Sequence, residues 1–570
     1  MYTKPLRKTL FCLIAGVLTA ASVSAQRTIY VSPDGDQGND GLSRLTPAPT
    51  ITRGSALARP GDTVIVMPGT YARETPTVDW DEVGIARSGR PGEYITIRGE
   101  RDAEGRRPLI VSTQLQALSC FQKSYLVIEG LELTVGEEDD QGLLEFFQRP
   151  DTQRFWNRPA EEAWNGRVGI ALNNAHHIIA RDLYIHDFPG NGVQSGGADA
   201  ILIEDVTVEH CGYGAPNANS GISFYQPRDR GQGNVDDYPD YGIVIRGCET
   251  RYNTNLRNFV DWSDDNLTDG NGIILDDFRR SQSTNPVNYP KRTLVLQNVS
   301  YGNGGPGINV FESDRIDIYH NSTFDNGISA SLANQAYNIV ATPREMQLFA
   351  LADVNVVNNI LYSTDDERRF YSGDDRNQER LTFRNNLLYS SERDGSELTV
   401  PDGNLVGAPG YFSAQPLGRV QRERLARTTR PYDNASVQAR LREPTANAGF
   451  PIQDLRIPET SPAAGAAEDL GYGSDIGALP VDGSVGVRDA PVTHDLGARL
   501  RYDGEAIAIA EVPAGARVFA YDALGRPVHA SEAKGAQAVR FDVRDYPTGV
   551  FNVEVRYGGE RWVGRVSVVR

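Results

Sequence analysis

The chain has 570 residues, more than one ordinary globular core holds, and a formal net charge of −18 at pH 7. So acidic a surface disfavours nucleic acid and anionic membranes as partners, because both are polyanions. The 4 cysteines lack metal-type spacing, and the sequence contains neither a phosphate-binding P-loop nor a Gly-x-Ser-x-Gly motif. The absence of these motifs from the sequence argues against zinc, nucleotide and esterase chemistry.

Residues 1–25 have the features of a signal peptide. A basic start is followed by an apolar run over residues 10–21, which is too short to span a membrane, and by small residues up to Ala25. The sequence shows no other long apolar segment. We expect cleavage near Ala25 and a secreted or cell-surface monomer without a transmembrane segment.

The first segment after the signal peptide contains Tyr-Val-Ser-Pro-Asp-Gly-Asp at 30–36 and Pro-Gly-Asp-Thr-Val-Ile-Val-Met-Pro-Gly-Thr-Tyr at 60–71. It closely resembles the N-terminal cap of secreted right-handed parallel β-helix proteins, including pectate-lyase-like enzymes of polysaccharide lyase family nine. The resemblance implies an all-β fold, with a right-handed parallel β-helix (solenoid) and its cap over residues 27–482.

Eight mutually similar strand-like segments then follow one another between residues 126 and 386. Each ends in a small, amide or acid residue, and these residues form a column: Gly130, Asp182, Asp205, Gly247, Asn298, Asn321, Asn359 and Asn386. Such residues tolerate the left-handed backbone of a tight bend, and stacked side-chain amides can bond one another. The column predicts a corner of the β-helix.

A second column of Gly-Ile or Gly-Val pairs begins at Gly169, Gly192, Gly221, Gly272 and Gly307. The bare coil is about 23 residues long, and longer spacings mark insertions near 136–166, 212–219, 226–241, 253–270 and 278–292. All of these insertions are expected to flank the Gly-Ile strands. In a solenoid, insertions collected on one face mark the binding side.

Carboxyl groups crowd the ends of two of these strands. Asp276 or Asp277 should lie about 4.8 Å, one coil, from Glu312. Two carboxyl groups at that spacing can share a proton, bind a cation, or act as an acid and a nucleophile. The alternation of strand residues does not decide which of the two aspartates faces outward. Glycoside hydrolysis by this carboxyl pair is one candidate function.

Four further carboxylates precede the second strand: Asp261, Asp264, Asp265 and Asp269. Such density is unfavourable without a cation, and Ca²⁺ accepts irregular oxygen-rich loops, although a solvated acidic loop is the simpler alternative. The cluster is similar to the Asp-rich calcium loop of family nine lyases. That resemblance implies a Ca²⁺ site formed by these residues.

Family nine lyases use a lysine as the base that removes the uronate C5 proton, while Ca²⁺ neutralises the neighbouring carboxylate. Lys291 is the only lysine in the insertions beside the Gly-Ile strands, so the resemblance makes it the candidate base, unless an arginine serves instead or Lys291 is an ordinary surface residue. Candidate substrate-binding residues in the same insertions are Tyr225, Gln226, Arg228, Arg230, Trp262, Arg279 and Arg280.

Two histidines, His186 and His210, fall near equivalent corner positions, with Tyr184 and Glu209 close by in sequence. They form either a His/Tyr acid–base pair or a stacked ladder of corner side chains.

The last part of the chain differs from the repeats. Residues 483–496 have the composition of a linker, and residues 497–570 alternate apolar and polar positions between turn residues, which predicts a small β-sandwich. The pattern is similar to the C-terminal sorting domain of the type nine secretion system. The resemblance implies export through that machinery, and an accessory module that binds sugar or only packs is the alternative.

Together these features predict an extracellular polysaccharide lyase that cleaves a uronate-containing polymer by Ca²⁺-assisted β-elimination. A glycoside hydrolase on the same scaffold and a non-catalytic carbohydrate-binding protein are the two alternatives, because a fold does not determine a function.

Overall fold

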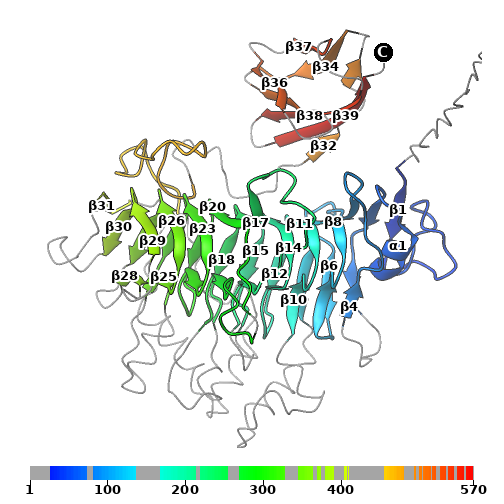
Figure 1. Ribbon diagram of the computed structural model, residues 1–570. Helices are drawn as coiled ribbons and strands as arrows, with labels where there is room; N and C mark the ends of the chain where they lie inside the picture. The colour runs from blue at the N-terminus through cyan, green and yellow to red at the C-terminus, as the bar shows by residue number, and fades with distance from the viewer. Residues whose placement is uncertain are drawn as a thin grey trace, which may run out of the picture.

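Short apolar strands separated by turn residues recur along the chain, and in the computed structural model they stack into long sheets (Figure 1). The structure describes residues 26–72, 81–135, 167–212, 219–254, 269–284, 286–327, 344–363, 369–373, 379–390, 403–406, 408–409, 455–479, 493–495, 500–502, 505–514, 516–521, 527–533, 537–544, 549–557 and 560–568. Within these segments the protein is nearly all β, and no described helix is long and apolar enough to cross a membrane.

Three parallel sheets form a right-handed parallel β-helix. Sheet A contains β1 (Thr28–Val31), β2 (Thr63–Val66), β5 (Ile95–Gly99), β8 (Ser124–Glu129), β11 (His176–Arg181), β14 (Asp199–Glu204), β17 (Tyr241–Arg246), β20 (Arg292–Leu296), β23 (Asp314–Tyr319), β26 (Ala352–Val357) and β29 (Glu379–Arg384).

Sheet B contains β3 (Thr70–Tyr71), β6 (Leu109–Ser112), β9 (Glu132–Val135), β12 (Tyr184–His186), β15 (Thr207–Glu209), β18 (Glu249–Arg251), β21 (Val299–Tyr301), β24 (Ser322–Phe324), β27 (Ile360–Ser363), β30 (Leu387–Ser390) and β31 (Leu405–Val406). Sheet C contains β4 (Asp81–Gly84), β7 (Gln116–Ser119), β10 (Val168–Ala171), β13 (Val193–Gly196), β16 (Ile222–Tyr225), β19 (Ile273–Asp276), β22 (Ile308–Phe311), β25 (Arg344–Phe349) and β28 (Arg369–Gly373). Each coil passes from sheet C to sheet A to sheet B.

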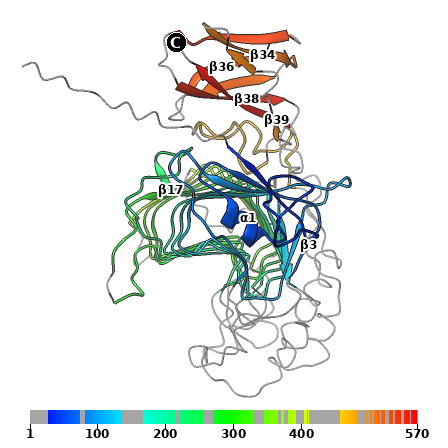
Figure 2. The ribbon, with the colours of Figure 1, turned by 90° about the vertical axis from the view of Figure 1, so that its right-hand side faces the viewer.

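Alternate side chains of every strand fill the interior. In sheet A the inward position of successive coils is Ile178, Ile201 and Ile243, which stack in register and are fully buried. The N-terminal end of this core is closed by α1 (Ile51–Leu57), which lies across the first coils (Figure 2). Gly54 of α1 approaches β1 so closely that a Cβ atom would stand 2.4 Å from Val31 Cγ2.

The corner between sheets A and B carries the predicted amide ladder at the predicted residues. The left-handed bend coincides with the predicted column in the first four of these coils and falls one residue earlier in the last four. The left-handed residues are Gly130, Asp182, Asp205, Gly247, Gln297, His320, Asn358 and Asn385. In the later coils the ladder is formed by the residues that follow: Asn298, Asn321, Asn359, Asn386 and Asn404. Their side chains hydrogen-bond in sequence, each Nδ2 to the next Oδ1 at 2.9 Å. The expected amide stacking therefore exists, but from Gln297 onward the bend is made one residue before the ladder residue.

The segment 455–479 covers this corner in the C-terminal coils. Gln297 Nε2 donates to the Tyr472 carbonyl at 2.9 Å, and Asn358 Nδ2 donates to the Glu468 carbonyl at 2.9 Å. Side chains at the left-handed positions thus hold a later part of the chain against the coils.

Two further sheets form the small C-terminal β-sandwich. One contains β32 (Thr493–Asp495), β39 (Glu560–Val568), β38 (Gly549–Tyr557), β35 (Arg517–Tyr521) and β36 (Pro527–Glu532), and the other contains β33 (Leu500–Tyr502), β34 (Ala506–Val512) and β37 (Gln537–Asp542). Its core includes Ile507, Val518 and Val553. The sorting role of this module and the signal peptide, whose residues lie outside the described ones, stay predictions.

Candidate functional site

The outer face of sheet C presents one side chain per coil at the exit of each strand. Tyr225, Asp276, Phe311 and Phe349 occupy the same position on four successive coils. The residues before them point into the core, where Phe224, Leu275 and Val310 are fully buried. The side chains of this row therefore face outward, and Tyr225 is 39% exposed.

The two neighbouring aspartates have different surroundings. Asp276 is the last residue of β19 and is partly buried on the outer face. Asp277 has a left-handed backbone (φ +53°) and is fully buried at the corner between sheets C and A. Its carboxylate accepts hydrogen bonds from Gln226 Nε2 at 2.6 Å, from Ser281 N at 2.6 Å and from Ser281 Oγ at 2.8 Å. Asp277 thus anchors the following loop, and Asp276 is the residue that a ligand on sheet C can reach.

Glu312 follows Phe311 at the equivalent corner of the next coil (φ +47°). One amide connects it with Asp276, since Gln282 Nε2 lies 3.4 Å from Asp276 Oδ1 and 3.3 Å from Glu312 Oε2. Ser281 Oγ also lies 2.6 Å from Glu312 Oε2. The loop after β19 therefore holds the two carboxyl groups side by side on neighbouring coils.

Burial is the main reason why the pKa of Asp276 is raised to about 7. The negative charges of Asp269, Asp277 and Glu312 raise this pKa further, while the hydrogen bond from Gln282 lowers it. Asp269, a predicted metal ligand from the loop before β19, is thus close enough to act on Asp276. A carboxyl group that titrates near neutral pH can donate or accept a proton under ordinary conditions.

Tyr225 and Arg280 lie beside this group. Burial raises the pKa of Tyr225, the charges of Asp276 and Asp277 raise it further, and the positive charge of Arg280 lowers it. Arg280 is itself held in a left-handed turn (φ +54°) of the loop after β19. The site thus combines an exposed aromatic ring, a cation and two carboxyl groups.

Lys291 is not brought into this group. Its ammonium donates to both oxygens of the fully buried Asp199, at 2.8 and 2.7 Å, and also to the Gly233 carbonyl. Asp229 lies 3.3 Å from the same nitrogen. A cation with these partners is placed to fix two loops, so the geometry does not support the predicted role of Lys291 as a base.

The other predicted binding residues divide into two kinds. Gln226 and Arg279 are engaged in the fold, through Asp277 and through a 2.5 Å bond from Arg279 Nε to Asp314. Arg230 donates to Asn174 Oδ1 at 2.6 Å. Arg228 is exposed at the corner between sheets C and A and remains available to a ligand, with no ion pair among the described residues.

The insertion between β16 and β17 does not wall sheet C as expected. It folds over the outer face of sheet A, where Val235 is buried against Leu202, Val244 and Leu294. Tyr238 of this insertion accepts a 2.5 Å bond from Arg246 Nη1. An apolar stripe on the outside of sheet A explains this direction, because the stripe is buried by the insertion.

The predicted Ca²⁺ site cannot be assembled from the described residues. Asp269 is described, whereas Asp261, Asp264, Asp265 and the binding candidate Trp262 lie outside the described residues. Within the described segments no group of three His, Cys, Asp or Glu side chains is arranged to hold a metal ion. Calcium binding therefore stays a prediction.

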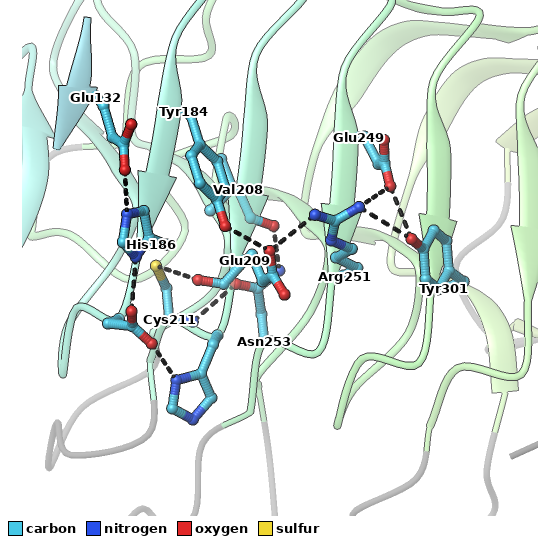
Figure 3. Close-up of polar contacts among 12 residues, drawn as sticks. Glu132, Tyr184, His186, Val208, Glu209, Cys211, Glu249, Arg251, Asn253 and Tyr301 are labelled. Carbon is cyan, nitrogen blue, oxygen red and sulfur yellow. Dashed lines mark hydrogen bonds and ion pairs between the residues drawn. The ribbon is translucent and has the colours of Figure 1, made fainter. Parts of the chain in front are cut away.

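His186 belongs to a polar network on the outer face of sheet B (Figure 3), and His210 joins this network through Asp187. His186 contacts Asp187 through Nδ1 at 2.6 Å and Glu132 through Nε2 at 3.2 Å, and its ring stacks on Tyr184 at 4.4 Å. His210 Nδ1 lies 2.6 Å from the other oxygen of Asp187. This arrangement agrees better with a ladder of corner side chains than with a His/Tyr base pair.

The network continues over the next coils. Glu209 accepts bonds from the Tyr184 hydroxyl at 2.9 Å and from Arg251 Nη2 at 2.8 Å, and Arg251 also contacts Glu249. Burial lowers the pKa of His186, but its two acidic partners outweigh burial and raise it to about 9. The imidazolium is therefore a structural cation at neutral pH.

Sequence reasoning missed Ser281 and Gln282, which connect the carboxyl groups. Both lie in an irregular loop, where no periodicity indicates a direction. The only signal was their position five and six residues after Asp276 in an insertion beside the Gly-Ile strands.

No family model and no curated protein matches the chain. Among solved structures, the pectate lyase Pel9A is similar at 16% identity over 81% of this chain and 98% of that one, with a TM-score of 0.40. A rhamnogalacturonan lyase has 14% identity over 68% and 91%, with a TM-score of 0.39. A GH136 lacto-N-biosidase from Eubacterium ramulus has 16% identity over 64% and 56%, with a TM-score of 0.38. At such identities these likenesses concern the fold and carry no argument about activity.

Proposed function

We propose that this chain is a carbohydrate-active enzyme that binds a polysaccharide along the outer face of sheet C and cleaves it with Asp276 as a catalytic residue. The observation that supports this is the Asp276–Glu312 pair, joined by one amide on neighbouring coils beside the exposed ring of Tyr225. Aromatic surface with a few convergent polar groups is typical of ligand sites.

Among cleavage chemistries, the described residues best support glycoside hydrolysis. This reaction needs one carboxylic acid to protonate the leaving oxygen and one carboxylate to act as base or nucleophile, with water adding across the broken bond. Asp276 suits the acid, because its pKa is raised to about 7. Glu312 suits the second role, because it stands on the next coil at the same edge of the sheet.

β-Elimination from a uronate is the second candidate. Asp276 would then remove the C5 proton while the C4–O bond breaks and a C4–C5 double bond forms, and the departing oxygen would take a proton from water. A cation must neutralise the uronate carboxylate. Arg280 favours this chemistry, because it is a cation close to the site. Its positive charge acts on Tyr225, which neighbours Asp276. Ca²⁺ held by the acidic loop before β19 would add to it. Without such a cation, the negative charge around Asp276 favours a neutral glycan.

A panel of pectin, alginate, glycosaminoglycan, ulvan and neutral xylans tests the proposal, each polymer with Ca²⁺ and with EDTA. A hydrolase releases reducing ends without new ultraviolet absorbance. A lyase generates an unsaturated product that absorbs in the ultraviolet, and the predicted calcium mechanism makes it sensitive to EDTA. If no polymer yields either product, cleavage is contradicted and carbohydrate binding remains as the function.

Asp276→Asn is expected to lower kcat at least about 100-fold, because the side chain can no longer transfer a proton. The folded protein should not lose stability, since the change removes a charge from a partly buried acidic site. Asp240→Asn, an exposed aspartate in the insertion over sheet A, is the matched control and should keep full activity. Full activity in Asp276→Asn would disprove the assignment.

A further inference from the structure

A row of outward-facing residues on sheet C continues from Tyr225 toward the N-terminal coils. Gly196 pairs with Tyr225 in register, and its N–H donates to Asn173 Oδ1 of the preceding coil at 2.7 Å. Gln122 N donates to the Asn173 carbonyl at 3.1 Å, which places Phe121 at the same position one coil earlier. We call Phe121, Asn173, Gly196 and Tyr225 the aromatic strip.

Both ends of the aromatic strip are exposed rings. Phe121 is 48% exposed and Tyr225 is 39% exposed, and they are the only exposed large aromatic side chains of the described residues. They stand three coils apart at one strand position, so about 14 Å separates them along the axis. Single exposed apolar residues are ordinary, but two rings on one line that leads to Asp276 indicate a binding surface.

Between the two rings the surface carries only short side chains and is polar. Gly196 has no side chain, and Asn173 presents a short amide whose Oδ1 would lie 3.1 Å from a Cβ atom on Gly196. In the neighbouring outward row Gln194 is partly buried, and Ser223, its partner in register, is only 8% exposed. Rings can cover the apolar faces of sugar units, while amides and hydroxyls can bond sugar hydroxyl groups.

We propose that the aromatic strip is a second subsite for the polysaccharide, which holds the sugar units on the N-terminal side of the cleavage point, with Phe121 at its far end. This inference rests on the proposed function for the choice of polymer. From Asp276 to Phe121 the subsite spans four coils, about 19 Å. The enzyme therefore prefers chains long enough to reach Phe121 over short oligosaccharides.

Binding is measured first, by affinity electrophoresis of the Asp276→Asn protein in gels that contain each polymer of the panel. At least one polymer should retard it, and adding Phe121→Ala should weaken that binding about five- to tenfold. Phe121→Trp should restore it. The matched control is Leu45→Ala, because Leu45 is an apolar residue that is 92% exposed in the N-terminal cap. Equal retardation of Phe121→Ala and Leu45→Ala would overturn the subsite, and so would no retardation by any polymer.

Kinetics on a size series of oligosaccharides separates this inference from the proposed function. Phe121→Ala should raise KM for long oligosaccharides and leave kcat and the short ones unchanged. An equal loss on all lengths would overturn the subsite while leaving cleavage intact. Conversely, retardation that depends on Phe121 without cleavage would contradict only the proposed function.

Discussion

Two adjacent aspartates at the end of β19 differ because the backbone turns between them. Asp276 still belongs to the strand and faces outward, whereas Asp277 adopts a left-handed conformation and turns its carboxylate onto the loop that follows. Desolvation and neighbouring acids raise the pKa of Asp276, while backbone and side-chain donors surround Asp277. Two residues of the same type thus divide the proposed catalytic role and a structural one.

Gln282 acts on the pKa of Asp276, the proposed acid. Its hydrogen bond lowers the pKa of Asp276, so Gln282→Ala should raise that pKa above its present value of about 7. If Asp276 acts as the acid, it must be protonated, and activity falls as pH rises through its pKa. The descending limb of the kcat–pH profile should therefore move to higher pH in Gln282→Ala.

The profile of Gln232→Ala, an exposed amide in the insertion over sheet A, should coincide with that of the unaltered protein. A shift of the Gln282→Ala limb toward lower pH would show that the amide does not stabilise the ionised form of Asp276.

Two insertions at the corner between sheets C and A are fastened to one buried carboxylate. Asp199, the first residue of β14, accepts bonds from Arg230 N at 2.7 Å, from the Tyr289 hydroxyl at 2.6 Å and from Lys291. Phe278 packs edge-on against Tyr289 at the other end of the second loop. This fastening holds both insertions at the corner, whereas Ser281 and Gln282 are held by Asp277.

Lys291→Ala should destabilise the protein by about 3 kcal/mol, because it leaves the buried Asp199 without its cation. At 25 °C, well below unfolding, kcat should change less than about threefold, since Lys291 does not touch the Asp276 group. Thermal unfolding and initial rates measure the two effects. Lys123→Ala is the control for stability. Loss of kcat without loss of stability would restore Lys291 as the base.

Across the whole molecule, the outer face of sheet B is held together by charge in the N-terminal coils. His186 is wedged between Glu132 and Asp187, with His210 on the far side of Asp187 and Tyr184 against its ring. Farther along, Tyr301 and Phe324 are buried with Leu455 in an apolar cluster. Along the axis of the solenoid, the contacts between side chains on the outer face of sheet B therefore change from ionic to apolar.

This ionic section makes stability depend on pH. The pKa of His186 rises from its ordinary value near 6.5 to about 9 in the folded state. Its contribution is complete below about 6.5 and is lost as pH rises through about 9. The melting temperature should fall over this interval, and less steeply in His186→Asn.

The pKa of His529 shifts in the opposite direction. Burial lowers this pKa, so protonation of His529 opposes folding. A melting curve of His186→Asn that follows the unaltered protein between pH 6.5 and 9 would contradict the assignment.

The sequence predicted the fold well because strand periodicity repeats from coil to coil and the later coils add an amide column. In the later coils it placed the bend one residue late, since adjacent asparagines such as Asn358 and Asn359 are equally suited to a left-handed corner. It also sent the insertion before β17 to the wrong sheet, because loops carry no period and the apolar stripe that attracts Val235 is spread over separate strands. The carboxyl pair was predictable from register, but its bridging Gln282 was not.

The segment 455–479, which covers the corner of the C-terminal coils, has a consequence for the order of folding. Gln297 and Asn358 donate to its carbonyl groups, and Arg384 forms an ion pair of 2.6 Å with its Glu468. These coils are therefore completed by residues synthesised long after them. The N-terminal coils can assemble as they emerge from the ribosome, whereas the C-terminal coils reach their final stability only once residue 479 has emerged.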